Sequence, residues 1–480
     1  MEILLTTNPD DSGGKNYILL LIGFLLSIGL TFSFSAIGDK YLPIIFISSL
    51  PLIFVFSFNF RLTYCILIVS LFINLHFQWL SSAIWLAILV PISYIIGFKN
   101  IKLKEFNLPI TISLLIYLFT MFLSLKNSVD LLFSLYLMYN MVAFVMILYF
   151  SVASIRSKKE VLTYIILFLI FNIFNSFHVL FDGLTSSKRA FGFAGVMFVD
   201  YVGLAITMNF ILLLTSRRKN YRLLLVVSLI LFVIALLITQ TRNAWISTFL
   251  SLFLLMIFLI IMSQKFNMRR LLLVTMLVAS VVVISSLVLV VTSVNPEVGE
   301  RAQQTTEIDE SIDHTGAVKS SLVMRFFIWH TAYMAFVEHT VFGIGAYSFP
   351  FSSFQYYTIP RFLFDTYVEG RTPHITYLAV AVETGVVGLL GFLIFLFASL
   401  KFSFDGIRYS KSFEESSFSL LLFWPLIYII ISMLMTDAWL WGQGLILWAI
   451  LLGFNLWNSK TLKQKYLLEN SAALKNQHAL

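Results

Sequence analysis

Charged residues are scarce in this sequence. Asp, Glu, Lys and Arg together make up 12% of the 480 residues, whereas 59% are hydrophobic. A soluble globular protein of this length cannot bury so large an apolar share in its core, so the composition excludes that class. Cysteine is scarcer still: Cys65 is the single one, which excludes an intrachain disulfide.

Long apolar runs are what the sequence has instead. Runs of about 17 to 25 residues recur from Asn16 to Trp457, long enough for helices that cross roughly 30 Å of hydrocarbon and unlike the alternation of an outer-membrane barrel. The sequence therefore predicts an all-α polytopic membrane protein with about 12–14 transmembrane helices. The expected spans are 16–36, 41–59, 62–79, 83–98, 107–124, 130–155, 160–181, 193–216, 221–239, 242–263, 270–293, 373–400, 416–436 and 438–457.

Lysines and arginines assort to one side of these spans. By the positive-inside rule that side is cytoplasmic, with both termini on it, and the net charge of +8 reflects such loops rather than a nucleic-acid surface. The first residues are polar and the first apolar run has no cleavage site, so we expect no cleaved signal peptide. The residues on this side are Lys99, Lys102, Lys104, Arg156, Lys158, Lys159, Arg217, Arg218, Lys219, Arg222, Lys265, Arg269, Arg270, Lys401, Arg408, Lys411, Lys460, Lys463 and Lys465.

The opposite side carries one large segment. We expect transmembrane helices 1–11 in residues 1–292, an extracytoplasmic loop domain in 293–372, the C-terminal transmembrane helices in 373–457 and a cytoplasmic tail in 458–480. The loop begins with the acidic stretch "NPEVGERAQQTTEIDESIDHTG", which predicts a solvated start.

An amphipathic helix is expected in the second part of this loop, from Ser321 onward. Apolar residues there recur every three or four positions, which predicts a helix that lies on the bundle or at its interface. Gly343 and Gly345 should end it, and the aromatic sequence up to Phe364 should form an irregular cover over a cavity. The apolar stripe consists of Leu322, Phe326, Trp329, Tyr333 and Phe336.

Three cationic or basic side chains are expected at the extracytoplasmic ends of helices: Arg242, Arg325 and His374. A cation near a helix N-terminus is unfavourable, by about 0.3 to 1 kcal/mol, because the macrodipole is positive there. Free backbone N–H groups and guanidinium forks together form a strong anion site, and two arginines suit a diphosphate. The alternatives are an interfacial anchor for Arg242 and a solvated surface residue for Arg325.

His374 is expected at the start of a span. Thr372 can cap that helix and Pro373 suits its first position. The dipole then disfavours the imidazolium, so the ring stays neutral near pH 7 and can act as a general base toward a hydroxyl. The alternative is a histidine that only forms hydrogen bonds at the interface.

Metal ligation is not indicated by the histidine and carboxylate spacing. His330 and His339 lie on opposite faces of one helix, and neither an HExxH motif nor paired cysteines occur, so we expect no metal and no cofactor. Glu383 lies on the face opposite His374 and should form structural hydrogen bonds. Asp437, in an outer turn, either caps a helix or orients an acceptor sugar. Gly385, Gly388 and Gly391 share a face that predicts close helix packing.

Three stretches of the second half resemble one family. The series "TQTRNAWIS", "MRFFIWHTAYMAFVEHTVFGIGAYSF" and "HITYLAVAVETGVVGLLG" is similar to the O-antigen ligase and Wzy-type polysaccharide polymerase superfamily. That pattern has an S/T-R-G/A-like span start, an arginine and tryptophan before P-x-x-G-x-G, and HN-x-Y/F-L…E-x-G-x-x-G. The stretch "RAFGFAGVMFVDYVGLA" is also similar, and the resemblance covers about Arg189 to Leu400. Ile375 replaces the asparagine after the histidine, and Thr340 replaces the proline.

The resemblance implies a metal-independent membrane glycosyltransferase with a GT-C-like bundle in the bacterial cytoplasmic (inner) membrane and its active site on the extracytoplasmic side. Arg242 and Arg325 would bind the diphosphate of an undecaprenyl-diphosphate-linked oligosaccharide donor, and His374 would activate the glycan acceptor. Membrane lipids are further partners, and no nucleic acid is expected. Supporting roles are open to Arg189, Asp200, Tyr377 and Asp437.

The departures from the family pattern favour a polymerase of a cell-surface polysaccharide. The alternative within the family is a ligase that transfers glycan to lipid A core or protein. A non-enzymatic transporter or flippase of lipid-linked glycans is a further alternative, but that class places charges through the midplane of its helices, whereas here they gather at the outer ends.

Overall fold

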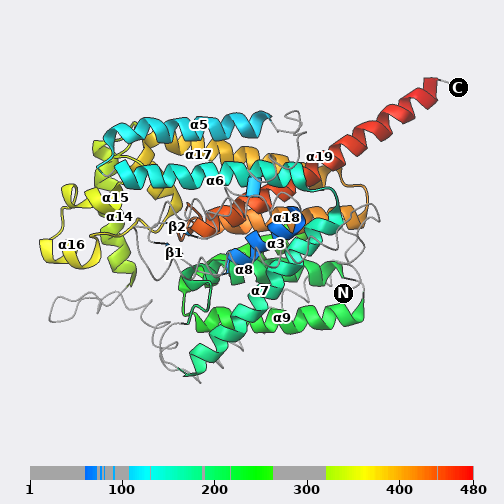
Figure 1. Ribbon diagram of the computed structural model, residues 1–480, viewed down its shortest axis with the longest axis horizontal. Coiled ribbons are helices and arrows are strands. Elements are labelled where there is room, and N and C mark those ends of the chain that lie inside the picture. Colours follow the sequence, from blue (N-terminus) through cyan, green and yellow to red (C-terminus); the bar gives the residue numbers. More distant parts are fainter. Residues whose placement is uncertain are drawn as a thin grey trace, which may run out of the picture.

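The computed structural model describes residues 60–72, 76–77, 80–81, 90–91, 108–129, 131–185, 190–216, 218–262, 321–440 and 442–478. Helices dominate these residues (Figure 1), with one two-residue antiparallel ladder between β1 (His76–Phe77) and β2 (Leu80–Ser81). The helices are α3 (Phe60–Ser70), α5 (Leu108–Ser124), η5 (Leu125–Asn127), α6 (Leu131–Ser154), α7 (Lys158–Thr185), η6 (Gly195–Met197), α8 (Phe198–Thr215), α9 (Lys219–Ile238), α10 (Arg242–Ile261), α14 (Ser321–Glu338), α15 (Phe349–Ser352), η7 (Ser353–Gln355), α16 (Arg361–Tyr367), α17 (Thr376–Tyr409), α18 (Phe413–Ser432), η8 (Ala438–Leu440) and α19 (Gly442–His478).

Eight helical segments of the described chain are long and apolar enough to cross a membrane. They confirm the prediction of an all-α polytopic membrane protein, because soluble domains do not carry so many such helices. The segments are Pro109–Asn127, Lys158–Gly183, Gly195–Thr215, Lys219–Ile238, Arg242–Ile261, Thr376–Tyr409, Phe413–Ser432 and Gly442–Ser471.

The expected spans from 107 to 263 coincide closely with α5 to α10, and those at 416–436 and 438–457 fall on α18 and α19. The expected span 62–79 is wrong in extent, because α3 ends at Ser70 and a turn follows. The spans 16–36, 41–59 and 270–293 lie outside the described residues, as does all of 83–98 except 90–91. The total of 12–14 helices therefore stays a prediction.

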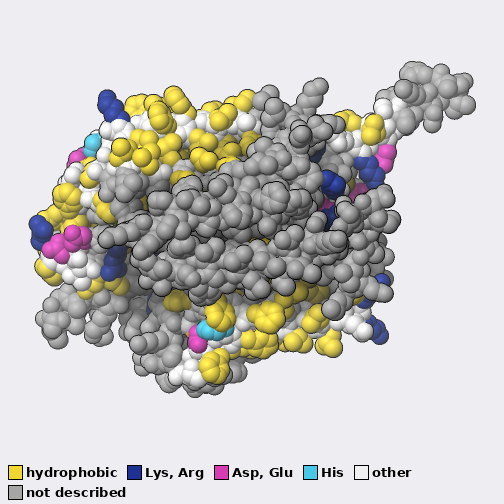
Figure 2. All heavy atoms as spheres, in the orientation of Figure 1, with side chains coloured by type: hydrophobic (Ala, Val, Ile, Leu, Met, Phe, Trp, Pro, Cys, Tyr) yellow, Lys and Arg dark blue, Asp and Glu magenta, His cyan; other side chains and the backbone are white. Residues whose placement is uncertain are grey.

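The long helices run side by side, and the bundle has two distinct ends (Figure 1). One end, here called the loop end, carries α14, α15 and α16. The other, here called the basic end, carries the turns around Lys158, Arg218 and Lys411, where Arg61 pairs with Glu160 at 2.7 Å and Lys411 with Glu469 at 2.6 Å. Figure 2 shows hydrophobic side chains over the long sides of the bundle and charged ones mostly at its ends, which is the distribution that a bilayer requires.

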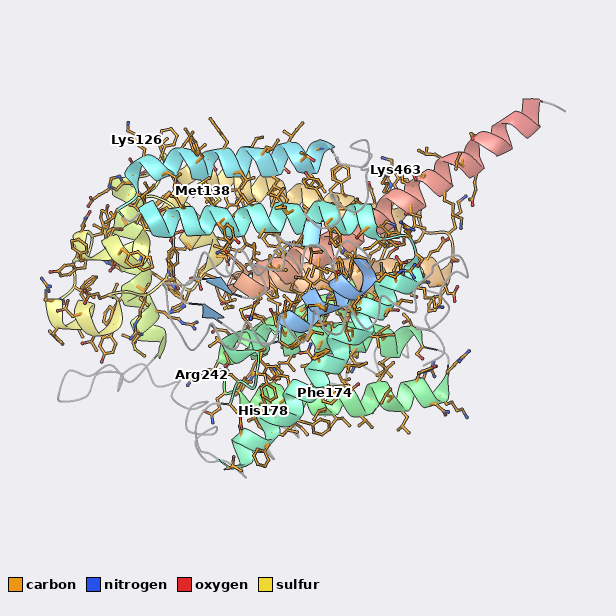
Figure 3. All side chains as sticks on the ribbon, viewed as in Figure 1. Lys126, Met138, Phe174, His178, Arg242 and Lys463 are labelled. Carbon is orange, nitrogen blue, oxygen red and sulfur yellow. The ribbon has the colours of Figure 1, made fainter. Side chains whose placement is uncertain are left out.

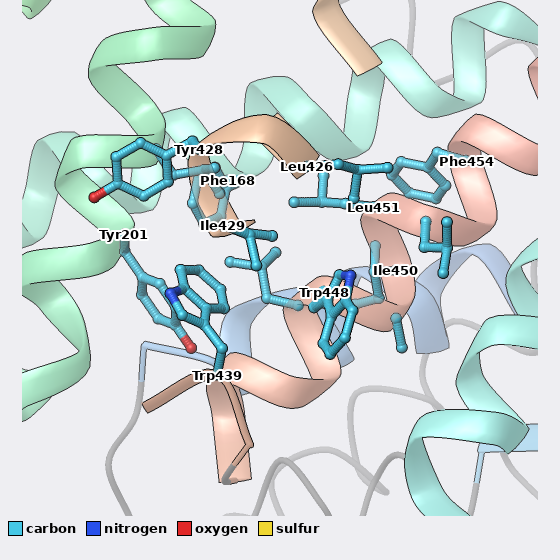
Figure 4. Packing of buried hydrophobic residues seen from close by; sticks show 14 of the residues in the cluster. Phe168, Tyr201, Leu426, Tyr428, Ile429, Trp439, Trp448, Ile450, Leu451 and Phe454 are labelled. Carbon is cyan, nitrogen blue, oxygen red and sulfur yellow. The ribbon is translucent and has the colours of Figure 1, made fainter. Parts of the chain in front are cut away.

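Helix α17 occupies the centre of the C-terminal half and packs against α5, α18 and α19. The core of the bundle contains large aromatic side chains, including Tyr201 of α8, Tyr428 of α18, Trp439 of η8 and Trp448 of α19 (Figure 4). Small residues allow close approach where the helices touch: a Cβ added to Gly391 would lie 3.3 Å from the Cα of Tyr117 on α5. The spacing prediction is thus right for Gly391.

The amphipathic helix predicted from Ser321 is α14, which ends at Glu338. Its buried face differs from the expected stripe. Ile328, Ala332 and Ala335 are buried under the loop, whereas Phe326 and Tyr333 are 62% and 58% exposed. The smaller residues face inward because α14 packs closely on α16 and α17. The segment after it contains α15, η7 and α16 and is thus partly helical rather than wholly irregular.

Candidate active site

The turn between α18 and η8, residues 433–437, brings three distant segments together at the loop end. The backbone N–H of Thr376 donates to Met433 O at 3.0 Å, and the Thr376 hydroxyl donates to Thr436 O at 2.7 Å. From α10, Asn243 Nδ2 donates to Met435 O at 2.7 Å. These bonds fix the start of α17 and the start of α10 on one short turn.

His374 lies at this junction, two residues before α17. The helix begins at Thr376, and its N-cap residue is Ile375, which makes no side-chain capping bond. The predicted cap at Thr372 and helical start at Pro373 are therefore wrong. His374 itself has a φ of 56°, a left-handed conformation that is uncommon for a residue other than glycine. The indole N–H of Trp329 on α14 donates to Pro373 O at 2.9 Å and holds the preceding peptide.

Asp437 faces the imidazole of His374. Its Oδ1 lies 4.0 Å from His374 Nδ1, and the His374 side chain is 40% exposed. The other oxygen, Oδ2, is buried and makes no hydrogen bond with any described residue. Asp437 thus lies next to the candidate base, and no side-chain cap from it is seen in the described chain. This geometry favours an orienting role toward the ring or toward a bound hydroxyl.

Arg325 reaches the same place from α14. Its Nη1 donates to Asn243 Oδ1 at 2.8 Å, so Asn243 links Arg325 to Met435 O through its two side-chain atoms. Arg242 is the residue before Asn243 and the first residue of α10. Figure 3 shows Arg242 toward the loop end, whereas Lys463 lies toward the basic end. The structure therefore brings both arginines and His374 to the same end of the bundle.

The surroundings of His374 favour its neutral form. Burial is the largest cause that lowers the pKa of His374, and the positive charges of Arg325 and Arg371 lower it further, while Asp437 raises it. The sequence predicts the same direction from the dipole of a helix that contains His374. That cause does not hold, because His374 precedes the helix, but the predicted direction is the same.

Asp200 lies in the first turn of α8, where the helix dipole favours a carboxylate. The hydroxyl of Ser432 donates to Asp200 Oδ1 at 2.6 Å, and Trp439 Nε1 donates to Ser432 Oγ at 2.9 Å. Asp200 also interacts electrostatically with Asp437. A buried chain of polar groups therefore underlies the turn that carries Asp437.

The remaining expected residues are less closely connected to this cluster. The Tyr377 hydroxyl donates to Ile430 O on α18 at 3.2 Å, which is a contact within the bundle. Arg189 lies outside the described residues. Within the described residues, no group of three or more His, Cys, Asp or Glu side chains could hold a metal ion. The absence of a metal and a cofactor stays a prediction.

Two residues of this site were not singled out by the sequence: Asn243, which bridges Arg325 and Met435, and Thr376, which ties α17 to the turn. Asn243 could have been found from the sequence, because it is a polar residue directly after the arginine that begins a span. Thr376 gave no signal, because its partners are backbone atoms far along the chain.

The cluster has the parts that a group transfer from a phosphorylated donor needs. Guanidinium groups and the N-terminus of α10 attract an anion. A neutral imidazole beside them can take a proton, and a carboxylate on its Nδ1 side can orient it. The site is thus suited to hold an anionic leaving group while a hydroxyl is deprotonated.

The part of the chain that carries Arg242, Arg325 and His374 matches a known family. Residues 227–393 match the family model described as O-antigen ligase. The matched segment includes Arg242, Arg325 and His374, whereas Asp200 and Asp437 lie outside it. No curated protein matches the chain. The match confirms the resemblance drawn from the motifs.

Proposed function

We propose that the chain, of which residues 227–393 match the O-antigen ligase family model, is a glycosyltransferase with an undecaprenyl-diphosphate-linked glycan as donor. The acceptor is a sugar hydroxyl, and the product is a longer glycan plus undecaprenyl diphosphate. We further propose that the acceptor is a second lipid-linked repeat, which makes the protein a polymerase of a surface polysaccharide. The departures at Ile375 and Thr340 from the superfamily pattern support that choice.

In the proposed reaction, His374 removes the proton of the acceptor hydroxyl. With Asp437 on the Nδ1 side, that nitrogen carries the hydrogen and Nε2 accepts the proton. The acceptor oxygen forms a bond to the anomeric carbon of the donor. The bond from that carbon to the diphosphate oxygen breaks, and the diphosphate keeps the electron pair. The left-handed backbone at His374, held by neighbouring segments, presents the ring at the loop end.

Arg325 and Arg242 bind the leaving diphosphate in this proposal. A guanidinium fork matches phosphate oxygens with two parallel hydrogen bonds and stays charged at all relevant pH values. Two such groups neutralise the charge that develops as the bond breaks, so the proposed reaction uses no metal. The hydrogen bond from Arg325 to Asn243 supports this role, because it pre-orients the fork before the donor binds.

The charge distribution supports an extracytoplasmic active site. The basic end carries Lys158, Arg218 and Lys411, and the site lies at the other end. By the positive-inside rule, the basic end faces the cytoplasm and the loop end faces outward from the bacterial inner membrane. The C-terminal part of α19 is cytoplasmic in this orientation.

The convergence of Arg325, Asn243 and His374 on the turn 433–437 is the observation that supports the proposal most directly. The test is reconstitution of the purified protein in nanodiscs with the lipid-linked repeat of the host strain. Separation of the products by size should show a ladder of lipid-linked chains and free undecaprenyl diphosphate. A single transfer to lipid A core or protein, without a ladder, would identify a ligase. Movement of donor across a bilayer with no new glycosidic bond would overturn the proposal.

A further inference from the structure

Helix α17 (Thr376–Tyr409) is interrupted at Gly385. This residue has a φ of 70° and a ψ of −172°, which divides α17 into 376–384 and 386–409. A Cβ at Gly385 would clash with the main-chain oxygen of Val341. The glycine is thus required by a backbone break and a close approach, and the sequence-based prediction that it serves helix packing is wrong.

The chain after α14 fills this break. Ile344 N donates to Val382 O at 3.0 Å and Gly345 N to Glu383 O at 3.1 Å, while Val386 N donates to Thr340 O at 2.8 Å. These bonds replace the ones that an unbroken helix would make within itself. Unpaired backbone groups at a helix break are costly at membrane depth, so the turn 340–349 and the broken helix depend on each other.

The Glu383 side chain adds a second connection between the same two elements. Its carboxyl group lies next to the backbone N–H groups of Tyr347 and Phe349, beyond the glycines of the turn. Glu383 is 2% exposed, and its Oε1 makes no hydrogen bond with any described residue. The carboxyl group of Glu383 is therefore buried against the end of the turn.

The turn is also attached to the connection between α5 and α6 and to the first turn of α6. Asn127 Nδ2 donates to Gly343 O at 2.9 Å, and the Ser134 hydroxyl donates to Ala346 O. Ser348 Oγ donates to Ser128 Oγ at 3.2 Å. The turn is thus bonded both to the break in α17 and to the α5–α6 connection.

This arrangement joins the two helices that carry the proposed site. Arg325 lies on α14, which leads directly into the turn, and His374 lies two residues before the first half of α17, in which Glu383 is buried. We propose that Glu383 is a positioning residue: by holding the turn 340–349 in the break of α17, it fixes Arg325 relative to His374. The inference rests on the proposed function only for its effect on catalysis.

The first test compares two substitutions in nanodiscs. Glu383→Gln keeps an acceptor oxygen for both backbone N–H groups, whereas Glu383→Met has a similar length and no such acceptor. The expected result is a turnover number near wild type for the glutamine variant and a loss of about 100-fold for the methionine variant, because small misplacements of reacting groups cost that much. Equal and complete loss in both variants would overturn the proposal, because it would show that the carboxylate charge is needed.

The second test measures the geometry without using activity. In a Cys65→Ser background, spin labels at Tyr333 on α14 and Phe397 on α17 report the distance between the two helices; both positions are exposed. Glu383→Met should broaden the distance distribution, and Glu383→Gln should not. The matched control is Glu415→Met, which removes a partly buried carboxylate paired with Lys465 at the basic end. It should leave the distribution and the turnover number unchanged.

A milder variant covers the case in which Glu383→Met does not accumulate in the membrane. Asn127→Ala removes one hydrogen bond to the same turn from an exposed side chain and should broaden the same distribution to a smaller extent. A distribution identical to wild type in Glu383→Met, or in Asn127→Ala when that variant replaces it, would overturn the proposal. Absence of glycosyl transfer in the wild type would contradict the proposed function but leave this distance measurement valid.

Discussion

Asn243 and Arg325 are 82 positions apart in the sequence, and a 2.8 Å hydrogen bond from Arg325 Nη1 to Asn243 Oδ1 joins them at the loop end. The same amide holds Met435 O at 2.7 Å. Asn243 therefore connects the start of α10, the loop helix α14 and the turn 433–437. Its neighbour Arg242 is the first residue of α10.

Asn243→Ala should weaken donor binding with little effect on the amount of folded protein. A hydrogen bond to a charged group contributes about 1.5–3 kcal/mol, so loss of the bond to Arg325 should raise the KM for donor by about 10- to 100-fold. The measurement is transfer kinetics at varied donor concentration. An unchanged KM would show that Asn243 does not orient Arg325 for the donor.

Arg242→Lys should lose most activity, about 10-fold or more, because a point charge replaces a planar fork with two parallel donors. Donor binding to the purified variant should weaken in parallel. If donor binding matches wild type, Arg242 only anchors the helix at the interface, which is the alternative that the sequence left open.

The pH dependence of transfer should shift in opposite directions in two variants. His374 must be neutral to act as a base, so activity is present above its pKa and is lost as the pH falls through it. Burial and the arginines hold that pKa below the ordinary value of about 6.5. Asp437 raises the pKa, so Asp437→Asn should move the acid limb of kcat/KM to lower pH.

Arg371 has the opposite effect, because its positive charge lowers the pKa of His374. Arg371→Gln should therefore move the acid limb to higher pH. Arg371 also donates from Nη2 to Thr366 O at 3.1 Å, and the substitution removes this bond. The amount of folded protein in the membrane is therefore measured as the control. Shifts of the same sign in both variants would contradict the assignment of the acid limb to His374.

Ile375→Asn should stabilise the protein. Ile375 is the N-cap of α17 in an extended conformation and makes no side-chain cap, and an asparagine there can accept from a backbone N–H of the first turn. The expected gain is about 1 kcal/mol, seen as a higher midpoint of thermal unfolding in detergent. Ile375→Val, which offers no acceptor, is the control, and an equal midpoint in both variants would argue against a missing cap.

The sequence predicts the helices well and their ends at the site poorly. Hydropathy locates α5 to α10 because a span must satisfy its own backbone within hydrocarbon. Hydropathy and the local pattern do not locate the start of α17 correctly. The local pattern favours Thr372 and Pro373, but the bonds from Thr376 to Met433 and Thr436 decide where the helix begins.

The same limit applies to Gly385 and to α14. Glycine spacing alone does not distinguish close packing at Gly391 from a backbone break at Gly385, because the break exists only where the turn 340–349 fills it. On α14, large apolar residues such as Phe326 and Tyr333 predict the buried face. In the structure Ala332 and Ala335 are buried instead, because the loop packs closely on this helix. The site residues Arg242, Arg325 and His374 are identifiable from the sequence because each is a basic residue at or near the start of a predicted helix.

The most direct test of the central claim is the release of undecaprenyl diphosphate from a lipid-linked glycan by the His374→Ala variant in nanodiscs. The account predicts that this variant binds donor as wild type does, accumulates in the membrane to the same level and releases no carrier above background. Chain elongation and carrier release at the wild-type rate would contradict the assignment of His374 as the base.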